Sequence, residues 1–254
     1  PDVYEGAPTS ITAFFAIVPK VSAIALIYRF CLEPFADFYN DWRQIVIFLS
    51  LTSMFVGAFA AIVQTNLKRL LAYSSIGHIG YALIGLASAN SEGVKGVIIY
   101  MFVYVLMNIG IFSIILSIKL KDKYIETISD LSGLSKKKPL YSLCIAILMF
   151  SMSGIPPFAG FFGKFYIFVS ALEAELIYLA ILGVIASVIS AFYYLRIIKV
   201  IYFDEVLSEQ FYSNISSKSL VVLFISILTI SLFVLFPSIF TNIASNANSF
   251  FIIN

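Results

Sequence analysis

Long runs without a formal charge dominate this sequence and limit the structures that it can form. A membrane-spanning helix needs roughly 20 consecutive apolar residues to cross the hydrocarbon core. Uncharged runs of about that length occur at residues 45–63, 70–89, 96–118, 176–195 and 220–239. With 61% hydrophobic residues, 12% charged residues and a mean hydropathy of +0.99, the chain is too apolar for a water-soluble domain. The sequence therefore predicts an all-α, polytopic transmembrane helix bundle.

Two further apolar runs each contain one lysine. Residues 7–30 carry Lys20, and residues 140–172 carry Lys164. The second run is too long for one straight crossing, and its middle, SGIPPFAGFFG, cannot form regular helix because each proline lacks an amide donor and clashes with the preceding turn. We therefore expect about seven spans in a single transmembrane domain covering residues 1–254, with residues 140–172 forming a broken helix.

The lysine and arginine residues outside the spans predict the orientation of the chain. If seven spans alternate, the N-terminal segment and the loops at 64–69, 119–139 and 196–219 share one side. That side holds Lys68, Arg69, Lys119, Lys121, Lys123, Lys136, Lys137, Lys138, Arg196, Lys199 and Lys218, whereas the other side holds Arg29, Arg43 and Lys95. Because basic loops face the inner side of a membrane, the C-terminus is predicted on the outer side.

Lys20 and Lys164 are the first candidate site residues. Each follows proline: Pro19 removes the amide that would bond the Phe15 carbonyl, and two prolines precede Lys164. A lysine at bilayer depth costs about 3 kcal/mol, so it persists where a polar or hydrated interior receives it. Burial disfavours the ammonium form, and an interrupted helix supplies carbonyl groups and admits water. Both lysines are therefore candidates for proton exchange, and the alternative is a lysine that extends to the interface from a helix end.

His78, the single histidine of the chain, is the third candidate. Ser74, His78 and Tyr81 are spaced at i, i+4 and i+7, so they are predicted to share one helical face. Histidine titrates near neutrality and can relay protons. A lone histidine that is hydrogen-bonded to a serine is, however, more often structural, and this interpretation stays open.

Nothing in the sequence indicates redox chemistry in this chain. Cys31 and Cys144 stand in apolar contexts without a second ligand at metal spacing, and we interpret both as packing residues. The sequence lacks a Gly-rich nucleotide motif, a cysteine cluster and a histidine pair for haem. We therefore predict no cofactor and no metal in this chain, and no nucleic acid among its partners.

Three stretches carry a resemblance to a known family. PDVYEGAPTSITAFFAIVPK at 1–20, QTNLKRLLAYSSIGHIGYALIGLAS at 64–88 and SGIPPFAGFFGKFYIF at 153–168 resemble NADH dehydrogenase subunit 2, an antiporter-like membrane subunit of respiratory complex I. The stretches occur in the order of the family. The resemblance covers the entire chain but only the C-terminal half or so of the family.

The resemblance implies a fold of fourteen helices with two inverted five-helix repeats, of which the spans here would be helices eight to fourteen. It matches Lys20 to the central lysine of the eighth helix, His78 to the histidine of the tenth, and Lys164 to the lysine of the twelfth, towards the proton exit. The family's glutamate of the fifth helix and lysine of the seventh belong to the other half. We expect a separate chain to supply that half, as with a split mitochondrial gene, unless it precedes Pro1 in the same polypeptide.

The predicted function is therefore a proton-translocating subunit of NADH:ubiquinone oxidoreductase, without electron transfer in this chain. FMN, iron–sulfur clusters, NADH and ubiquinone are implied for the complex as a whole, and its other membrane subunits and the lipid bilayer are the partners. Abundant Phe, Ile, Tyr and Asn suggest an A/T-biased organelle genome, so the expected location is the mitochondrial inner membrane, with the C-terminus towards the intermembrane space. Two alternatives stay open: a subunit of a multi-chain cation/proton antiporter, and a purely structural membrane scaffold.

Overall fold

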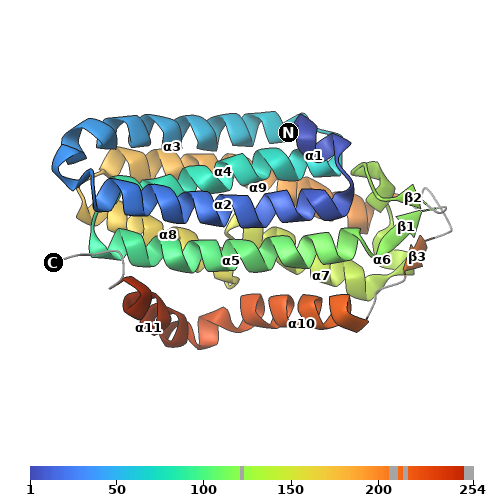
Figure 1. The fold of residues 1–254 in the computed structure, drawn as a ribbon. Helices are drawn as coiled ribbons and strands as arrows, with labels where there is room; N and C mark the ends of the chain where they lie inside the picture. The colour runs from blue at the N-terminus through green and yellow to red at the C-terminus, as the bar shows by residue number, and fades with distance from the viewer. Residues whose placement is uncertain (121–122, 206–210, 214–216, 249–254) are drawn as a thin grey trace.

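The chain folds as a bundle of long helices (Figure 1) in a computed structural model that describes residues 1–120, 123–205, 211–213 and 217–248. The helices are α1 (Asp2–Gly6), α2 (Thr9–Leu32), α3 (Tyr39–Ile62), α4 (Leu67–Ser88), α5 (Ser91–Ile115), α6 (Leu134–Lys137), α7 (Pro139–Ser153), α8 (Ala159–Glu173), α9 (Ile177–Phe203), α10 (Ser217–Leu232) and α11 (Pro237–Asn248), with 3-10 turns η1 (Ala36–Phe38), η2 (Ser129–Leu131) and η3 (Phe233–Leu235). Among the described residues, α2, α3, α4, α5 and α9 are each long and apolar enough to cross a membrane, and the bent pair α10–α11 would make a sixth span. The predicted all-α, polytopic fold class is confirmed.

Helix α4 is the central helix of the bundle. Of the 22 residues of α4, 18 are buried, whereas only 5 of the 24 residues of α2 are buried. Helix α3 packs closely along α4. The approach is so close that a methyl group on Gly57 of α3 would lie only 2.7 Å from the amide nitrogen of Gly77 in α4. Small residues allow transmembrane helices to approach in this way. Side chains on neighbouring helices can therefore meet at α4.

The predicted broken helix is confirmed, as α7 and α8. Each half has 15 residues, or about 22 Å of helix, which is too short to cross a bilayer alone. Gly154 ends α7 with φ 84°, in the left-handed region that favours glycine, and its amide donates to the carbonyls of Phe150 and Ser151. The Pro156–Pro157 peptide that follows is cis. Two helix ends thus meet inside the bundle.

The last predicted span, residues 220–239, is wrong at its C-terminal end. Helix α10 ends at Leu232, and the chain passes through η3 and turns by 98° into α11. Pro237 has no amide with which to continue the helix, and the residue before a proline avoids helical angles. Phe236 accordingly adopts φ −134° and ψ 50°. The sequence signal was therefore present, but helix α11 was not predicted.

The loops predicted to be basic gather at one end of the bundle (Figure 1). This end also carries a small antiparallel sheet that was not predicted, in the order β2 (Lys123–Tyr124), β1 (Ile118–Leu120) and β3 (Phe211–Ser213). Arg196 of α9 (Ile177–Phe203) joins this helix to the α3–α4 connection by donating to the carbonyls of Ile62 and Gln64. At the other end, Arg43 donates to the carbonyls of Ala87 and Ala174. The two groups of loops thus lie apart, although Lys121 is outside the described residues.

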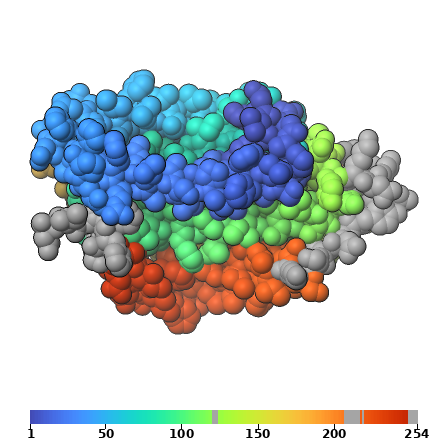
Figure 2. Space-filling view, viewed as in Figure 1, coloured from blue at the N-terminus to red at the C-terminus, as the bar shows by residue number. Residues whose placement is uncertain are grey.

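The outer surface of the bundle is strongly apolar. In the view of Figure 2, helices α2 and α3 in blue and α10 and α11 in orange and red cover much of the molecule, with α5 in green between them. Large side chains on these helices are exposed, among them Phe14, Leu26, Phe48, Phe59 and Phe224. Lipid or further transmembrane helices can cover such a surface, whereas water cannot do so without a large free-energy cost.

Candidate functional site

The three predicted site residues lie deep in the bundle. Lys20 is 11 residues from the start of α2 and 12 from its end, and His78 is 11 and 10 residues from the ends of α4. The Lys164 amine reaches Ser187, which is 10 residues into α9. At 1.5 Å per residue, these positions are about 15 Å or more from a helix end. The depth favours an interior role for both lysines over extension to the interface.

The broken helix supplies the hydrogen-bond acceptors of Lys164. The side chain is 4% exposed, and its Nζ donates to the carbonyls of Ser153 at 3.1 Å and Met152 at 3.4 Å. In an unbroken helix these carbonyls would bond the amides four residues on, but those residues are Pro156 and Pro157, which have no amide hydrogen. The two prolines therefore free the carbonyls that receive the amine.

Two further contacts complete the surroundings of Lys164. Its Nζ donates to Ser187 Oγ at 2.8 Å and lies 4.7 Å from the centroid of the Tyr81 ring. Gly154 makes room for the side chain, since a methyl group there would lie 3.1 Å from the Lys164 Cδ. An ammonium group has three donors, and the acceptors on α7 and α9 can bond all of them.

Lys20 is half-buried between α1 and α4. Its Nζ donates to Ser75 Oγ on α4 and lies 5.0 Å from the centroid of the Tyr4 ring on α1. Helix α2 continues past Pro19, and the Phe15 carbonyl that this proline frees accepts a hydrogen bond from the Tyr4 hydroxyl at 2.8 Å. The orphaned carbonyl predicted from the sequence is therefore present, and a tyrosine satisfies it.

Two tyrosine hydroxyls hold the His78 ring. Nδ1 lies 2.6 Å from the Tyr100 hydroxyl, and Nε2 lies 3.0 Å from the Tyr194 hydroxyl, which is itself 2.5 Å from Ser74 Oγ. Ser74 and His78 thus share one face, as predicted, but the Tyr194 hydroxyl lies between them and contacts both side chains. A neutral imidazole offers one donor and one acceptor, and hydroxyl groups can serve both. This arrangement suits a ring that passes protons in either direction.

Helix α4 connects the three sites through residues spaced three apart. Ser75 accepts from Lys20, His78 follows one turn later, and Tyr81 lies one turn further, beneath Lys164. Six residues of helix span about 9 Å. Two unit charges ~12 Å apart at an effective dielectric constant of 20 interact by about 1.4 kcal/mol, so a proton gained at one lysine can influence the other.

Neutral groups surround both lysines in the described part of the chain. The ion pairs found there join Arg29 with Glu33, Arg69 with Asp2 and Glu5, Lys95 with Glu92, and Lys199 with Asp204. Neither Lys20 nor Lys164 takes part in one. The same residues hold no cluster of three or more His, Cys, Asp or Glu side chains that could bind a metal. Hydroxyls, carbonyls and aromatic faces stabilise the protonated amine less strongly than a carboxylate would, so the amine can still lose its proton.

Sequence reasoning missed several members of this network. Tyr100 and Tyr194 have no motif that marks them, although Tyr100 is spaced i, i+4 with the buried Tyr104. The sequence predicts Lys68 in a basic loop, but the residue lies in α4, is 5% exposed and donates to the Ala7 carbonyl at 3.1 Å. Because Lys68 stands beside Arg69 in a short polar connection, the sequence pattern does not indicate that it is buried.

Comparisons with known proteins identify relatives of the whole described bundle. Residues 1–190 match the family described as NADH:quinone oxidoreductase/Mrp antiporter, TM. The chain is 52% identical over 238 residues to NADH-quinone oxidoreductase subunit N of Paramagnetospirillum magneticum, covering 94% of this chain and 49% of that protein. It is 53% identical over 251 residues to the subunit N of Pelagibacter ubique, covering 98% and 52%. The chain therefore spans about half the length of these curated relatives.

Two solved structures resemble this chain over nearly its whole length. A chain of respiratory complex I from Thermus thermophilus with bound aureothin is 29% identical, with a TM-score of 0.81 and coverage of 95% of this chain and 53% of that chain. A chain of the Mrp complex from Dietzia sp. is 20% identical, with a TM-score of 0.82 and coverage of 97% and 54%. At that identity the second match shows the fold alone.

Proposed function

Because this chain belongs to the NADH:quinone oxidoreductase and Mrp antiporter family of membrane proteins, we propose that it translocates protons as part of an NADH:ubiquinone oxidoreductase. The observation that carries the proposal is the pair of amines deep in the bundle: both are held by neutral groups, and Lys164 lies at the break between α7 and α8. A buried amine without a counter-ion is free to lose and regain its proton. A purely structural lysine would instead be expected to pair with a carboxylate.

Lys20, His78 and Lys164 form the proposed relay. Lys20 receives a proton from the half of the subunit that lies outside this chain, His78 passes it along α4, and Lys164 delivers it towards the far side of the membrane. The tyrosines on both ring nitrogens of His78 support this order, since each hydroxyl can accept and donate. FMN, iron–sulfur clusters, NADH and ubiquinone would be handled by other subunits, and this chain would bind none of them.

The surroundings of the chain follow from the same proposal. We place residues 1–254 as one transmembrane domain, the C-terminal half of a counterpart of subunit 2, in the mitochondrial inner membrane. The relatives named above are bacterial, whereas the abundance of Phe, Ile, Tyr and Asn supports the organelle. The basic end would face the matrix and the C-terminus the intermembrane space. The family's N-terminal half would pack against α2, whose Phe14, Val18, Leu26 and Phe30 are exposed.

The test is Lys164→Met in the assembled complex in sealed membrane vesicles. We expect NADH-driven proton translocation to fall by about 100-fold or more, the effect of losing a proton-transfer group, while the amount of assembled complex stays unchanged. Lys95→Met is the matched control, because this lysine lies at the start of α5 in an ion pair with Glu92. Undiminished proton-coupled turnover in Lys164→Met would favour the scaffold, and purification without flavin and iron–sulfur proteins would favour the antiporter.

A further inference from the structure

Tyr4 contacts α2 with its side chain at two residues, Phe15 and Lys20. Its hydroxyl donates to the Phe15 carbonyl at 2.8 Å, and its ring lies 5.0 Å from the Lys20 Nζ. A third bond links the same residue to α2, because Thr12 Oγ1 donates to the Tyr4 carbonyl at 2.9 Å. Tyr4 is thus fixed at both its backbone and its hydroxyl, with the ring between them facing the amine.

The proline of α2 makes this arrangement possible. Without Pro19, the amide at that position would occupy the Phe15 carbonyl, and the Tyr4 hydroxyl would have a competing donor. Burial raises the pKa of Tyr4 to about 12, so the hydroxyl keeps its proton at neutral pH. Tyr4 therefore donates a hydrogen bond to the Phe15 carbonyl and offers its ring face to Lys20.

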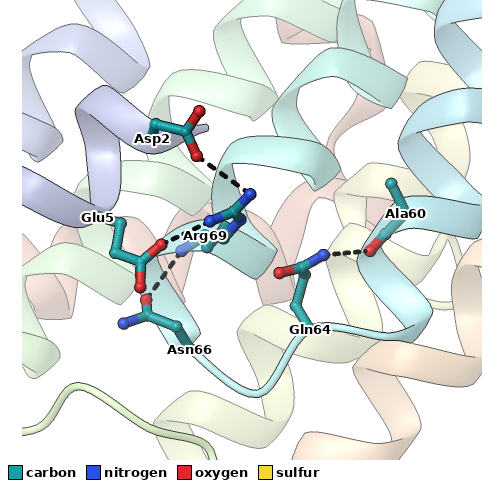
Figure 3. Close-up of polar contacts among 6 residues, drawn as sticks. All are labelled: Asp2, Glu5, Ala60, Gln64, Asn66 and Arg69. Atoms are coloured by element: carbon teal, nitrogen blue, oxygen red, sulfur yellow. Dashed lines mark hydrogen bonds and ion pairs between the residues drawn. The ribbon is translucent and has the colours of Figure 1, made fainter.

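A clamp on α4 holds the segment that carries Tyr4. Figure 3 shows Arg69 between Asp2 and Glu5 of α1, with Nη2 3.0 Å from Asp2 Oδ1 and Nη1 2.9 Å from Glu5 Oε2. Next to it, Lys68 donates to the Ala7 carbonyl at 3.1 Å. These contacts, which we call the Arg69 clamp, join α1 to the same helix that carries Ser75. The two partners of Lys20, one on α1 and one on α4, are therefore held at a fixed separation.

We propose that Tyr4 is a positioning residue for Lys20: its ring, held by the Arg69 clamp, keeps the ammonium group directed at Ser75 and hence at the His78 end of the relay. The proposal rests on the proposed function. A cation over a tyrosine face is attracted electrostatically, and the Lys20 side chain is long and rotatable. Without the ring, the amine can leave Ser75 and explore the half-buried space between α1 and α2. Proton transfer towards His78 then becomes less frequent.

The experiment is a double-mutant cycle in the assembled complex. Tyr4→Leu is compared with wild type, and again in a Lys20→Met background, by NADH-driven proton translocation in sealed vesicles. We expect Tyr4→Leu to lower translocation by roughly 2- to 30-fold, the range implied by the loss of a cation–π contact. In the Lys20→Met background the same substitution should change nothing further. Tyr4→Phe, which keeps the ring, should stay within about twofold of wild type, since the ring rather than the hydroxyl faces the amine.

The matched control is Tyr124→Leu, because the exposed Tyr124 ring lies 4.8 Å from the Lys119 amine in the small sheet at the basic end of the bundle. An equal loss from Tyr4→Leu with and without Lys20 would overturn the proposal, because it would mark a purely structural effect. Full activity of Tyr4→Leu alongside an impaired Lys20→Met would overturn it too, while leaving the relay intact. Full activity of Lys20→Met would instead refute the role of Lys20 in the relay. If Tyr4→Leu does not assemble, Tyr4→Met provides the same comparison.

Discussion

Replacing Gly160 with alanine would test whether the broken helix positions Lys164. A methyl group on Gly160 would lie 1.8 Å from the Ser151 carbonyl oxygen, and contacts of a Cβ atom below 3.0 Å essentially never occur. The start of α8 must therefore move away from the end of α7 by roughly 1 Å. That movement separates Lys164 from the carbonyls of Met152 and Ser153. A displacement of about 1 Å can slow a reaction by roughly 100-fold, and overpacking costs about 1–3 kcal/mol of stability.

The assay measures NADH-driven proton translocation in sealed vesicles together with the thermal midpoint of the assembled complex. We expect Gly160→Ala to lower both. Gly77→Ala is the control, because this glycine is next to His78 in sequence, yet the nearest atom to a methyl group there is the Met54 carbonyl oxygen at 4.0 Å. Wild-type translocation and stability in Gly160→Ala would refute the argument that the tight contact between α7 and α8 holds the amine in place.

Four further substitutions probe the packing of the bundle and the contacts at its ends. Gly57→Ala should destabilise the complex by about 1–3 kcal/mol, because its methyl group would meet the Gly77 amide at 2.7 Å; an unchanged thermal midpoint would contradict this. Asn90→Ala should cost about 1 kcal/mol, measured in the same way, because the Asn90 side chain caps α5 by accepting from Gly93 at 2.7 Å. Arg196→Met should increase protease cleavage at the basic end, because Arg196 bonds two carbonyls there. Arg29→Met removes only an exposed ion pair and should change the free energy of unfolding by less than about 1 kcal/mol.

The resemblance to antiporter-like subunits of complex I is confirmed at the level of the family, by the match over residues 1–190. The fold class and the broken helix are confirmed as well. The roles of Lys20, His78 and Lys164 stay predictions, and the experiments above address the two lysines. All three residues lie near the middle of the bundle, as their positions within the apolar runs predict. The prediction works because the thickness of the bilayer sets the length of the helices.

Local backbone chemistry is what the sequence alone determined. A helical hydrogen bond joins residues four apart, so a proline shows which carbonyl is left without its partner. Pro19 marks Phe15 in this way, and Pro156 marks the Met152 carbonyl that receives Lys164. The same rule places a turn at Pro237, whereas hydropathy alone continues the span to residue 239.

The tertiary structure decided which side chains meet. Ser187 approaches Lys164 and Tyr194 approaches His78 from positions far along the chain, and no spacing within one helix indicates such contacts. They depend on how closely α9 packs against α8 and α4, which is set by the volumes of many side chains together. The strands β1 and β3, separated by about ninety residues, pair for a similar reason: the helices that precede them bring their ends to the same side of the bundle.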